Sequence, residues 1–288
     1  MVFNRTCTCA CVPSEYGAPM NRMKGVLHSL LFLLLCPLVL IFTTAFVKTT
    51  SFTSTIKVGI ITCALTYGLT LLFLHWDGWK LRDAGLELTG KSGPRILLGF
   101  MIGLAIVALQ ECSLFAAGHT HWTYMSPAPP MRWLLLGLAA YLLLALREEL
   151  AFRAYPLRRL EHDLGLWPSL LILGLVFTLE HIAGGLSWTS SLLGPLAGAI
   201  LFGMAALATR GIAVPLGIHF AFNFGQWVMG QKETAVFWQA SIDPAFQKQA
   251  EALGYASYLV GTLAAAFGFW LYYQRCTKPM VAHAEQSH

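Results

Sequence analysis

Eight long apolar runs restrict the fold of this chain more than any other feature. The first, from Val26 to Val47, has about 22 residues, and a helix needs about 20 to cross a bilayer. Charged residues make up 11% of the chain, against about 25% in a soluble domain. We therefore predict an all-α, polytopic membrane protein with about eight transmembrane helices. The expected helices span residues 26–47, 58–74, 96–117, 133–155, 169–182, 192–209, 212–229 and 253–273.

The distribution of lysine and arginine predicts how these helices are oriented. Eight crossings put both chain ends on one side, where 13 of these residues would lie, against 5 on the other. Positively charged loops stay in the cytoplasm, so we expect both termini there. We expect a disordered cytoplasmic tail over 1–24, a single transmembrane domain over 25–275 and a second cytoplasmic tail over 276–288. The role of "CTCAC", residues 7–11, stays open.

The fourth expected helix carries adjacent charges in an apolar setting. A charged side chain at the bilayer centre costs about 2.5–3.5 kcal/mol, so such residues usually face a cavity or one another. Glu149 and Arg153 are four residues apart and share a helix face, where they can pair. Glu148 points about 100° away from Glu149 and is free for chemistry. The position of Arg147 is left open.

Two further expected helices also carry polar faces. Phe177 and His181 are four residues apart on the fifth helix, and His219 and Asn223 have the same spacing on the seventh. Because polar groups are costly in the bilayer, we expect these faces to share a cavity. The candidate active site therefore lies between helices four, five and seven. Glu180 is on a neighbouring face, and its role stays open.

These residue types suit hydrolysis. A carboxylate beside imidazoles can take a proton from water, and an amide can donate a hydrogen bond to an oxyanion. Alternatively, two histidines and a glutamate can bind Zn²⁺ and leave a position open for water, although the chain has no H-E-x-x-H motif. The same residues could form a proton or ion relay in a transporter. The chain shows no internal repeat of the kind that transporters often contain.

Three short motifs resemble a known family. "EELAFR" fits E-E-x-x-x-R, "FTLEH" fits F-x-x-x-H, and "HFAFN" fits H-x-x-x-N, in the order found in the CPBP family. This family contains the type II CAAX prenyl endopeptidases and bacterial proteins of bacteriocin processing and immunity. The resemblance covers a core at about residues 134–230.

The resemblance implies an intramembrane endopeptidase, with roles for each matching residue. Glu148 would activate the attacking water, and His181 would assist it or bind a metal. His219 and Asn223 would complete the site and stabilise the oxyanion. The supporting residues would be Glu149, Arg153 and Phe177. Zn²⁺ is the only cofactor left open, on Glu148, His181 and His219, and a metal-free mechanism is the alternative.

The resemblance also bears on substrate, partners and location. A prenylated CAAX protein and a short membrane-associated peptide are both open as substrates. A catalytically inactive immunity or interaction protein is the remaining alternative within the family. We expect the bacterial inner (plasma) membrane as the location, with the bilayer and a peptide or protein substrate as partners. The net charge of +5 is modest, so no nucleic-acid partner is expected. The oligomeric state is left open.

Overall fold

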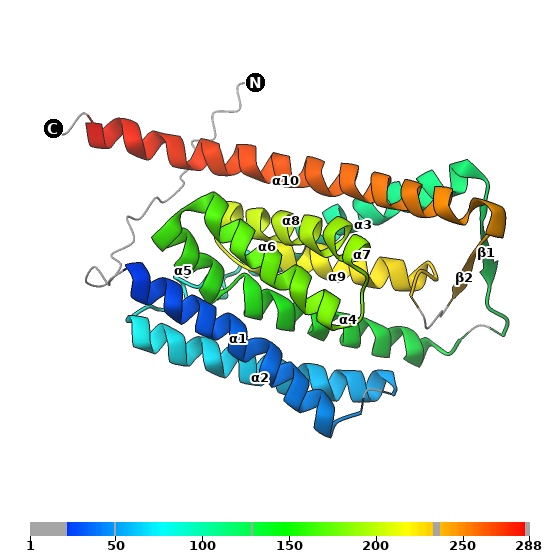
Figure 1. Ribbon diagram of the computed structural model, residues 1–288, viewed down its shortest axis with the longest axis horizontal. Coiled ribbons are helices and arrows are strands. Elements are labelled where there is room, and N and C mark those ends of the chain that lie inside the picture. The colour runs from blue at the N-terminus through cyan, green and yellow to red at the C-terminus, as the bar shows by residue number, and fades with distance from the viewer. Residues whose placement is uncertain (1–21, 49, 128, 233–236, 286–288) are drawn as a thin grey trace.

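The computed structural model describes residues 22–48, 50–127, 129–232 and 237–285, and it forms a bundle of helices (Figure 1). The expected disorder of the N-terminal tail and the "CTCAC" motif fall outside these residues. Each of the eight apolar runs forms a helix, which confirms the all-α prediction. These helices are α1 (Arg22–Phe46), α2 (Phe52–Asp77), α3 (Ser92–Ala117), α4 (Met131–Phe152), α6 (Leu166–Ala183), α8 (Pro195–Thr209), α9 (Ala213–Val228) and α10 (Gln247–Glu285).

Several short elements were not predicted. Two short helices, α5 (Tyr155–Leu164) and α7 (Trp188–Leu193), precede α6 and α8, and a 3₁₀ turn (Pro244–Phe246) precedes α10. Strands β1 (Thr120–Tyr124) and β2 (Trp238–Ile242) pair antiparallel. This ribbon lies at one end of the bundle, opposite the end where α1 begins and α10 ends (Figure 1).

The fold is that of a polytopic membrane protein. Six helical segments of the described chain are long and apolar enough to cross a membrane, namely α1, α2, α3, α6, α7 with α8, and α10. Helix α4 carries three adjacent charges, from Arg147 to Glu149, and α9 has only 16 residues. The start of α1 and the end of α10 lie at the same end of the bundle, as an even number of crossings requires (Figure 1). The number of crossings stays a prediction.

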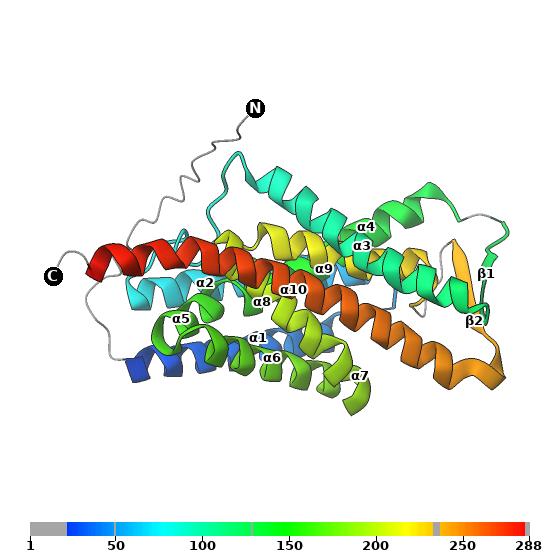
Figure 2. The ribbon, with the colours of Figure 1, turned by 90° about the horizontal axis from the view of Figure 1, so that it is seen from above.

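Helix α8 is the centre of the bundle. Within its apolar segment 61% of the residues are buried, against 28–39% in the other five candidate spans. Its sequence "PLAGAILFGMAALAT" is rich in alanine and glycine, and small residues let neighbouring helices approach closely. Helices α6, α9 and α10 all pack against it, and α10 crosses the outside of the bundle over α8 and α3 (Figure 2).

Helices α3 and α9 touch through their glycines. A Cβ atom on Gly99 would collide with the backbone of Val214, and one on Gly217 would collide with the backbone of Ile96. Gly103 similarly meets the backbone of Ile218. This backbone contact fixes the position of α9 along α3.

A proline ends α4 close to the expected site. Pro156 lacks the N–H that would bond to the carbonyl of Phe152, so the α4 helix cannot continue through it. The chain turns at Arg153 and Ala154, and α5 starts at Tyr155. The sequence-based boundary at residue 155 was three residues too late, and Arg153 becomes the residue that caps α4.

A buried ion cluster fixes α5 against α1 and α2. The Asp77 carboxylate lies 2.7 Å from Nδ1 of His28 and accepts a hydrogen bond of 2.8 Å from the Tyr155 hydroxyl. Nε of Arg159 lies 3.4 Å from Asp77 and 3.0 Å from Asp163. Both aspartate side chains are fully buried. We call these five residues the α5 ion cluster.

Candidate active site

The predicted pair of Glu149 and Arg153 is formed and deeply buried. Nη1 of Arg153 lies 3.8 Å from Oε1 of Glu149, as expected for residues four apart on one helix. The guanidinium carbon of Arg153 lies 4.5 Å from the ring centre of Phe177 and 5.2 Å from that of Phe202. Phe152 forms a third side of this box. The box holds Arg153 by cation–π contacts and leaves it 2% exposed.

His219 lies between the two glutamates of α4. Its Nδ1 is 2.9 Å from Oε1 of Glu149, and its Nε2 is 3.4 Å from Oε2 of Glu148. The ring stacks on Phe202 from α8, with centroids 4.6 Å apart and planes at 12°. Because an ionised carboxylate only accepts, Nδ1 of His219 is the donor to Glu149. This bond turns Nε2 toward Glu148.

Arg147 and Glu180, whose positions were left open from the sequence, both belong to this cluster, because Arg147 bonds to Glu148 and to Glu180. Nη2 of Arg147 donates to Oε1 of Glu148 and Nη1 donates to Oε1 of Glu180, each at 2.9 Å. The Arg147 side chain is 7% exposed. Oε2 of Glu148 is buried and accepts no hydrogen bond from the described residues, and it lies 3.4 Å from Nε2 of His219.

His181 is oriented by its own helix. Its Nδ1 lies 2.8 Å from the carbonyl oxygen of Phe177, four residues earlier. A carbonyl can only accept, so Nδ1 carries the proton and Nε2 of the neutral ring carries a lone pair. The ring also packs on the Phe177 ring at 4.4 Å. These two contacts fix the orientation of the His181 ring.

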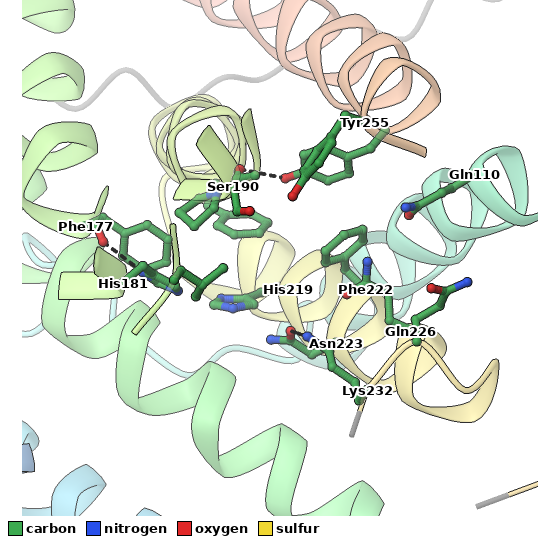
Figure 3. Close-up of a pocket in the computed structure, with 17 residues that line it drawn as sticks. Gln110, Phe177, His181, Ser190, His219, Phe222, Asn223, Gln226, Lys232 and Tyr255 are labelled. Carbon is green, nitrogen blue, oxygen red and sulfur yellow. Dashed lines mark hydrogen bonds between the residues drawn. The ribbon is translucent and has the colours of Figure 1, made fainter. Parts of the chain in front are cut away.

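A cavity of about 350 Å³ lies beside this cluster (Figure 3). His181, His219 and Asn223 all line it, together with Phe177. Figure 3 shows His219 between His181 and Asn223, with tyrosines of α10 on the opposite wall. Glu148 is not among the lining residues, but its Oε2 lies directly behind the ring of His219.

Lys232, which follows α9, is a further lining residue that concerns the chemistry. Lys232 approaches Asn223, with Nζ 3.5 Å from Oδ1 of the amide (Figure 3). This contact occupies the amide oxygen and leaves the Asn223 NH₂ group as a donor. Burial lowers the pKa of Lys232 below its ordinary value, and the negative charge of Glu148 acts in the opposite direction.

The described residues show no ready-made metal centre. Zn²⁺ was the cofactor left open on Glu148, His181 and His219. In the part of the chain that the structure describes, no three His, Cys, Asp or Glu side chains converge so that they could hold a metal ion. One nitrogen of each histidine is bonded to an acceptor, Nδ1 of His219 to Glu149 and Nδ1 of His181 to its own helix backbone. Nε2 of each ring is left as the atom that could bind Zn²⁺, because a metal-binding histidine usually donates its other ring N–H in this way. Metal binding stays a prediction, and the steps proposed below use only side chains of the protein.

The structure brings the predicted residues together. Glu148, Glu149 and His219 are in direct contact, and Phe177 links His181 to Arg153. Asn223 lines the same cavity as both histidines. Four residues were not assigned to the site from the sequence, namely Arg147, Glu180, Phe202 and Lys232. Arg147 and Glu180 gave a signal, since each is an ionisable group within an apolar helix, whereas Lys232 lies after the end of α9.

Phe202 gave no such signal, because a phenylalanine in an apolar helix looks like ordinary core.

The comparison with protein-family models matches residues 130–225 to the family described as "Type II CAAX prenyl endopeptidase Rce1-like". The matched segment contains the whole cluster from Arg147 to Asn223. A search of curated proteins found no match.

Proposed function

Because residues 130–225 match the Rce1-like family of type II CAAX prenyl endopeptidases, a family of membrane proteases, we propose that the protein hydrolyses a peptide bond in the cavity lined by α6, α8, α9 and α10, beside the charged cluster of α4. The observation that carries this proposal is the placement of His219. It contacts two carboxylates of α4 and lines the cavity. The substrate we propose is a membrane-associated peptide or protein tail, with a prenylated C-a-a-X tail as the first candidate.

Glu148 is the proposed base. Its free Oε2 takes a proton from a water molecule while the water oxygen attacks the carbonyl carbon of the scissile bond. Arg147 holds the other oxygen, so the carboxylate keeps one orientation. Glu148 then passes the proton to the leaving amide nitrogen as the C–N bond breaks. The products are a new carboxyl group and a new amine.

The carbonyl oxygen becomes negatively charged during attack and needs donors. We assign this role to the NH₂ group of Asn223 and to the imidazole of His219, because both side chains line the cavity. His181 assists by accepting a hydrogen bond at Nε2 from the attacking water, while the transferred proton goes to Glu148.

The replacement Glu148→Gln tests this proposal. Purified protein in liposomes is given a farnesylated C-a-a-X peptide, and cleavage is followed by mass spectrometry. Loss of the base should lower turnover about 10²- to 10⁴-fold. Glu251→Gln is the matched control, because Glu251 is exposed on α10 and bonded only to Gln247 in the described structure.

Two results would overturn the proposal. One is wild-type turnover by the folded Glu148→Gln protein. The other is ion or proton flux through the same liposomes with no cleavage of any peptide offered, which would favour the transporter alternative. Metal analysis of the active protein, with chelator treatment, tests the metal-free form of the mechanism.

A further inference from the structure

Among the described residues, the cavity beside the proposed catalytic cluster has one lysine on its wall and no acidic side chain. This lysine is Lys232, and the described lining residues include no arginine. The other polar lining groups are amides, hydroxyls and imidazoles, for example Gln226, Tyr255 and His181. A substrate that enters this cavity therefore meets a cation on its wall.

The arginines of α4 cannot supply this cation. Arg153 is enclosed by three aromatic rings and paired with Glu149, and it does not line the cavity. Arg147 is committed to Glu148 and Glu180. The resemblance implies that Glu149 and Arg153 are supporting residues, and neither of them lines the cavity.

The ammonium group of Lys232 makes fewer hydrogen bonds to the described residues than it has donors. An ammonium group has three donors, and one contact is formed, the long 3.5 Å hydrogen bond to Asn223. No carboxylate of the described residues lies within ion-pair distance of it. A partly buried cation without an anionic partner is costly, which favours binding of an anion. The lowered pKa of Lys232 is consistent with that cost.

The contact with Asn223 fixes where such an anion would lie. Asn223 is a proposed donor to the scissile carbonyl oxygen, and Lys232 is its immediate neighbour (Figure 3). An extended residue spans about 3.3–3.6 Å. A peptide held at its carbonyl by Asn223 can therefore reach Lys232 a short step further along. The cavity of about 350 Å³ is at the small end for ligand pockets, which suits a short tail.

We propose that Lys232 forms a carboxylate-binding subsite that positions the C-terminal end of the substrate. This inference rests on the proposed function and adds to it a residue that selects the substrate. A carboxylate that meets this ammonium forms a charge-assisted hydrogen bond, which is stronger than a neutral one. Lys232 is a positioning residue and takes no part in proton transfer.

The test compares three farnesylated peptides of one sequence. The first ends in a free carboxylate, the second in an amide, and the third in an amide with an aspartate one residue earlier. Wild-type protein should prefer the acid over the amide about 10- to 100-fold in kcat/KM. The third peptide distinguishes a terminal carboxylate from an acidic side chain, and it should resemble the plain amide.

Variants identify Lys232 as the source of that preference. Lys232→Gln should bring the ratio of acid to amide near one, whereas Lys232→Arg should retain most of it because the charge remains. Lys248→Gln, at an exposed position on α10, is the control and should keep the wild-type ratio. Melting temperatures show whether each variant is folded.

A binding measurement separates this inference from the proposed function. Peptide affinities are measured on the Glu148→Gln protein, with and without Lys232→Gln, so turnover is not needed. A preference for the acid that disappears with Lys232 supports the subsite even if no peptide is cleaved. Equal affinity for acid and amide overturns the subsite, whether or not the wild-type protein is a protease. A preference that persists in the folded Lys232→Gln protein overturns it as well.

Discussion

Two buried ion clusters lie in this molecule, and their carboxylates are used differently. In the α5 ion cluster, Asp77 has both oxygens occupied, Oδ1 by His28 and Oδ2 by Tyr155 and Arg159. In the cluster of α4, Glu148 has one oxygen held by Arg147 and the other without a hydrogen bond from the described residues. Asp163 and Glu149 also have one oxygen without a hydrogen bond, so contact with the cavity-lining His219 must be added to this criterion before Glu148 is distinguished from Asp77 and Asp163.

The surroundings of the two clusters differ in the same way. Asp77 and Asp163 have fully buried side chains between α1, α2 and α5. Glu148 keeps 14% exposure and contacts His219, which lines the cavity. Burial of ionisable groups alone is thus a poor guide to function, and access to a cavity is the better one.

The largest effect should follow removal of Asp77. The change Asp77→Ala leaves His28 and Tyr155 without their partner and removes one of the two carboxylates beside Arg159, and breaking a buried pair costs about 3–5 kcal/mol. Unfolding in detergent by denaturant, followed by tryptophan fluorescence, measures this loss. Asp77→Asn retains acceptor capacity for Tyr155 and should cost less. Equal stability of Asp77→Ala and wild type would break the comparison, because the α5 ion cluster would then hold nothing together.

A smaller effect is expected at Glu180. Arg147 divides its charge between Glu148 and Glu180, so Glu180→Gln concentrates it on Glu148 and weakens that carboxylate as a base. We expect kcat to fall about tenfold, which corresponds to about 1.4 kcal/mol, with KM nearly unchanged. Steady-state kinetics of the liposome assay measures both constants. A change confined to KM would assign Glu180 to substrate binding.

The smallest effect concerns pH and Lys232. Burial lowers the pKa of Lys232 below the ordinary value of about 10.4, so its charge is present at low pH and lost as pH rises through the lowered value. The preference for a free carboxylate should decline over that range, and Lys232→Arg should keep it. The measurement is the ratio of the rates at which the acid and the amide peptides are cleaved. The other titratable groups at the cavity affect both peptides alike, so they cancel in this ratio. These groups are Glu148, His181, His219, Tyr255 and Tyr258. A ratio independent of pH would contradict the role of Lys232.

The helices and the contacts within one helix could be predicted from the sequence. Apolar runs located eight helices, and the spacing of four placed Arg153 beside Glu149 and His181 beside Phe177. These features depend only on hydrophobicity and helix geometry. The break before α5 was missed because hydropathy continues across it, although Pro156 was a local sign.

The contacts between helices could not be predicted in this way. The pairing of Arg147 with Glu180 joins residues 33 positions apart on α4 and α6, and helix periodicity says nothing about the facing partner. The β1–β2 ribbon joins segments more distant still, such as Thr120 with Ile242. Each strand has five residues, too few to show a clear alternation.

The glycine contact between α3 and α9 has a mechanical consequence. His219 is two residues from Gly217, whose backbone lies directly against α3. A single added methyl group there would push the His219 imidazole away from Glu148 and Glu149. This wall of the cavity is therefore held rigidly by backbone contact. We expect any widening that admits a peptide at the opposite wall, where the Tyr258 side chain of α10 is held by a hydrogen bond to Gly194 and a ring contact with Phe222.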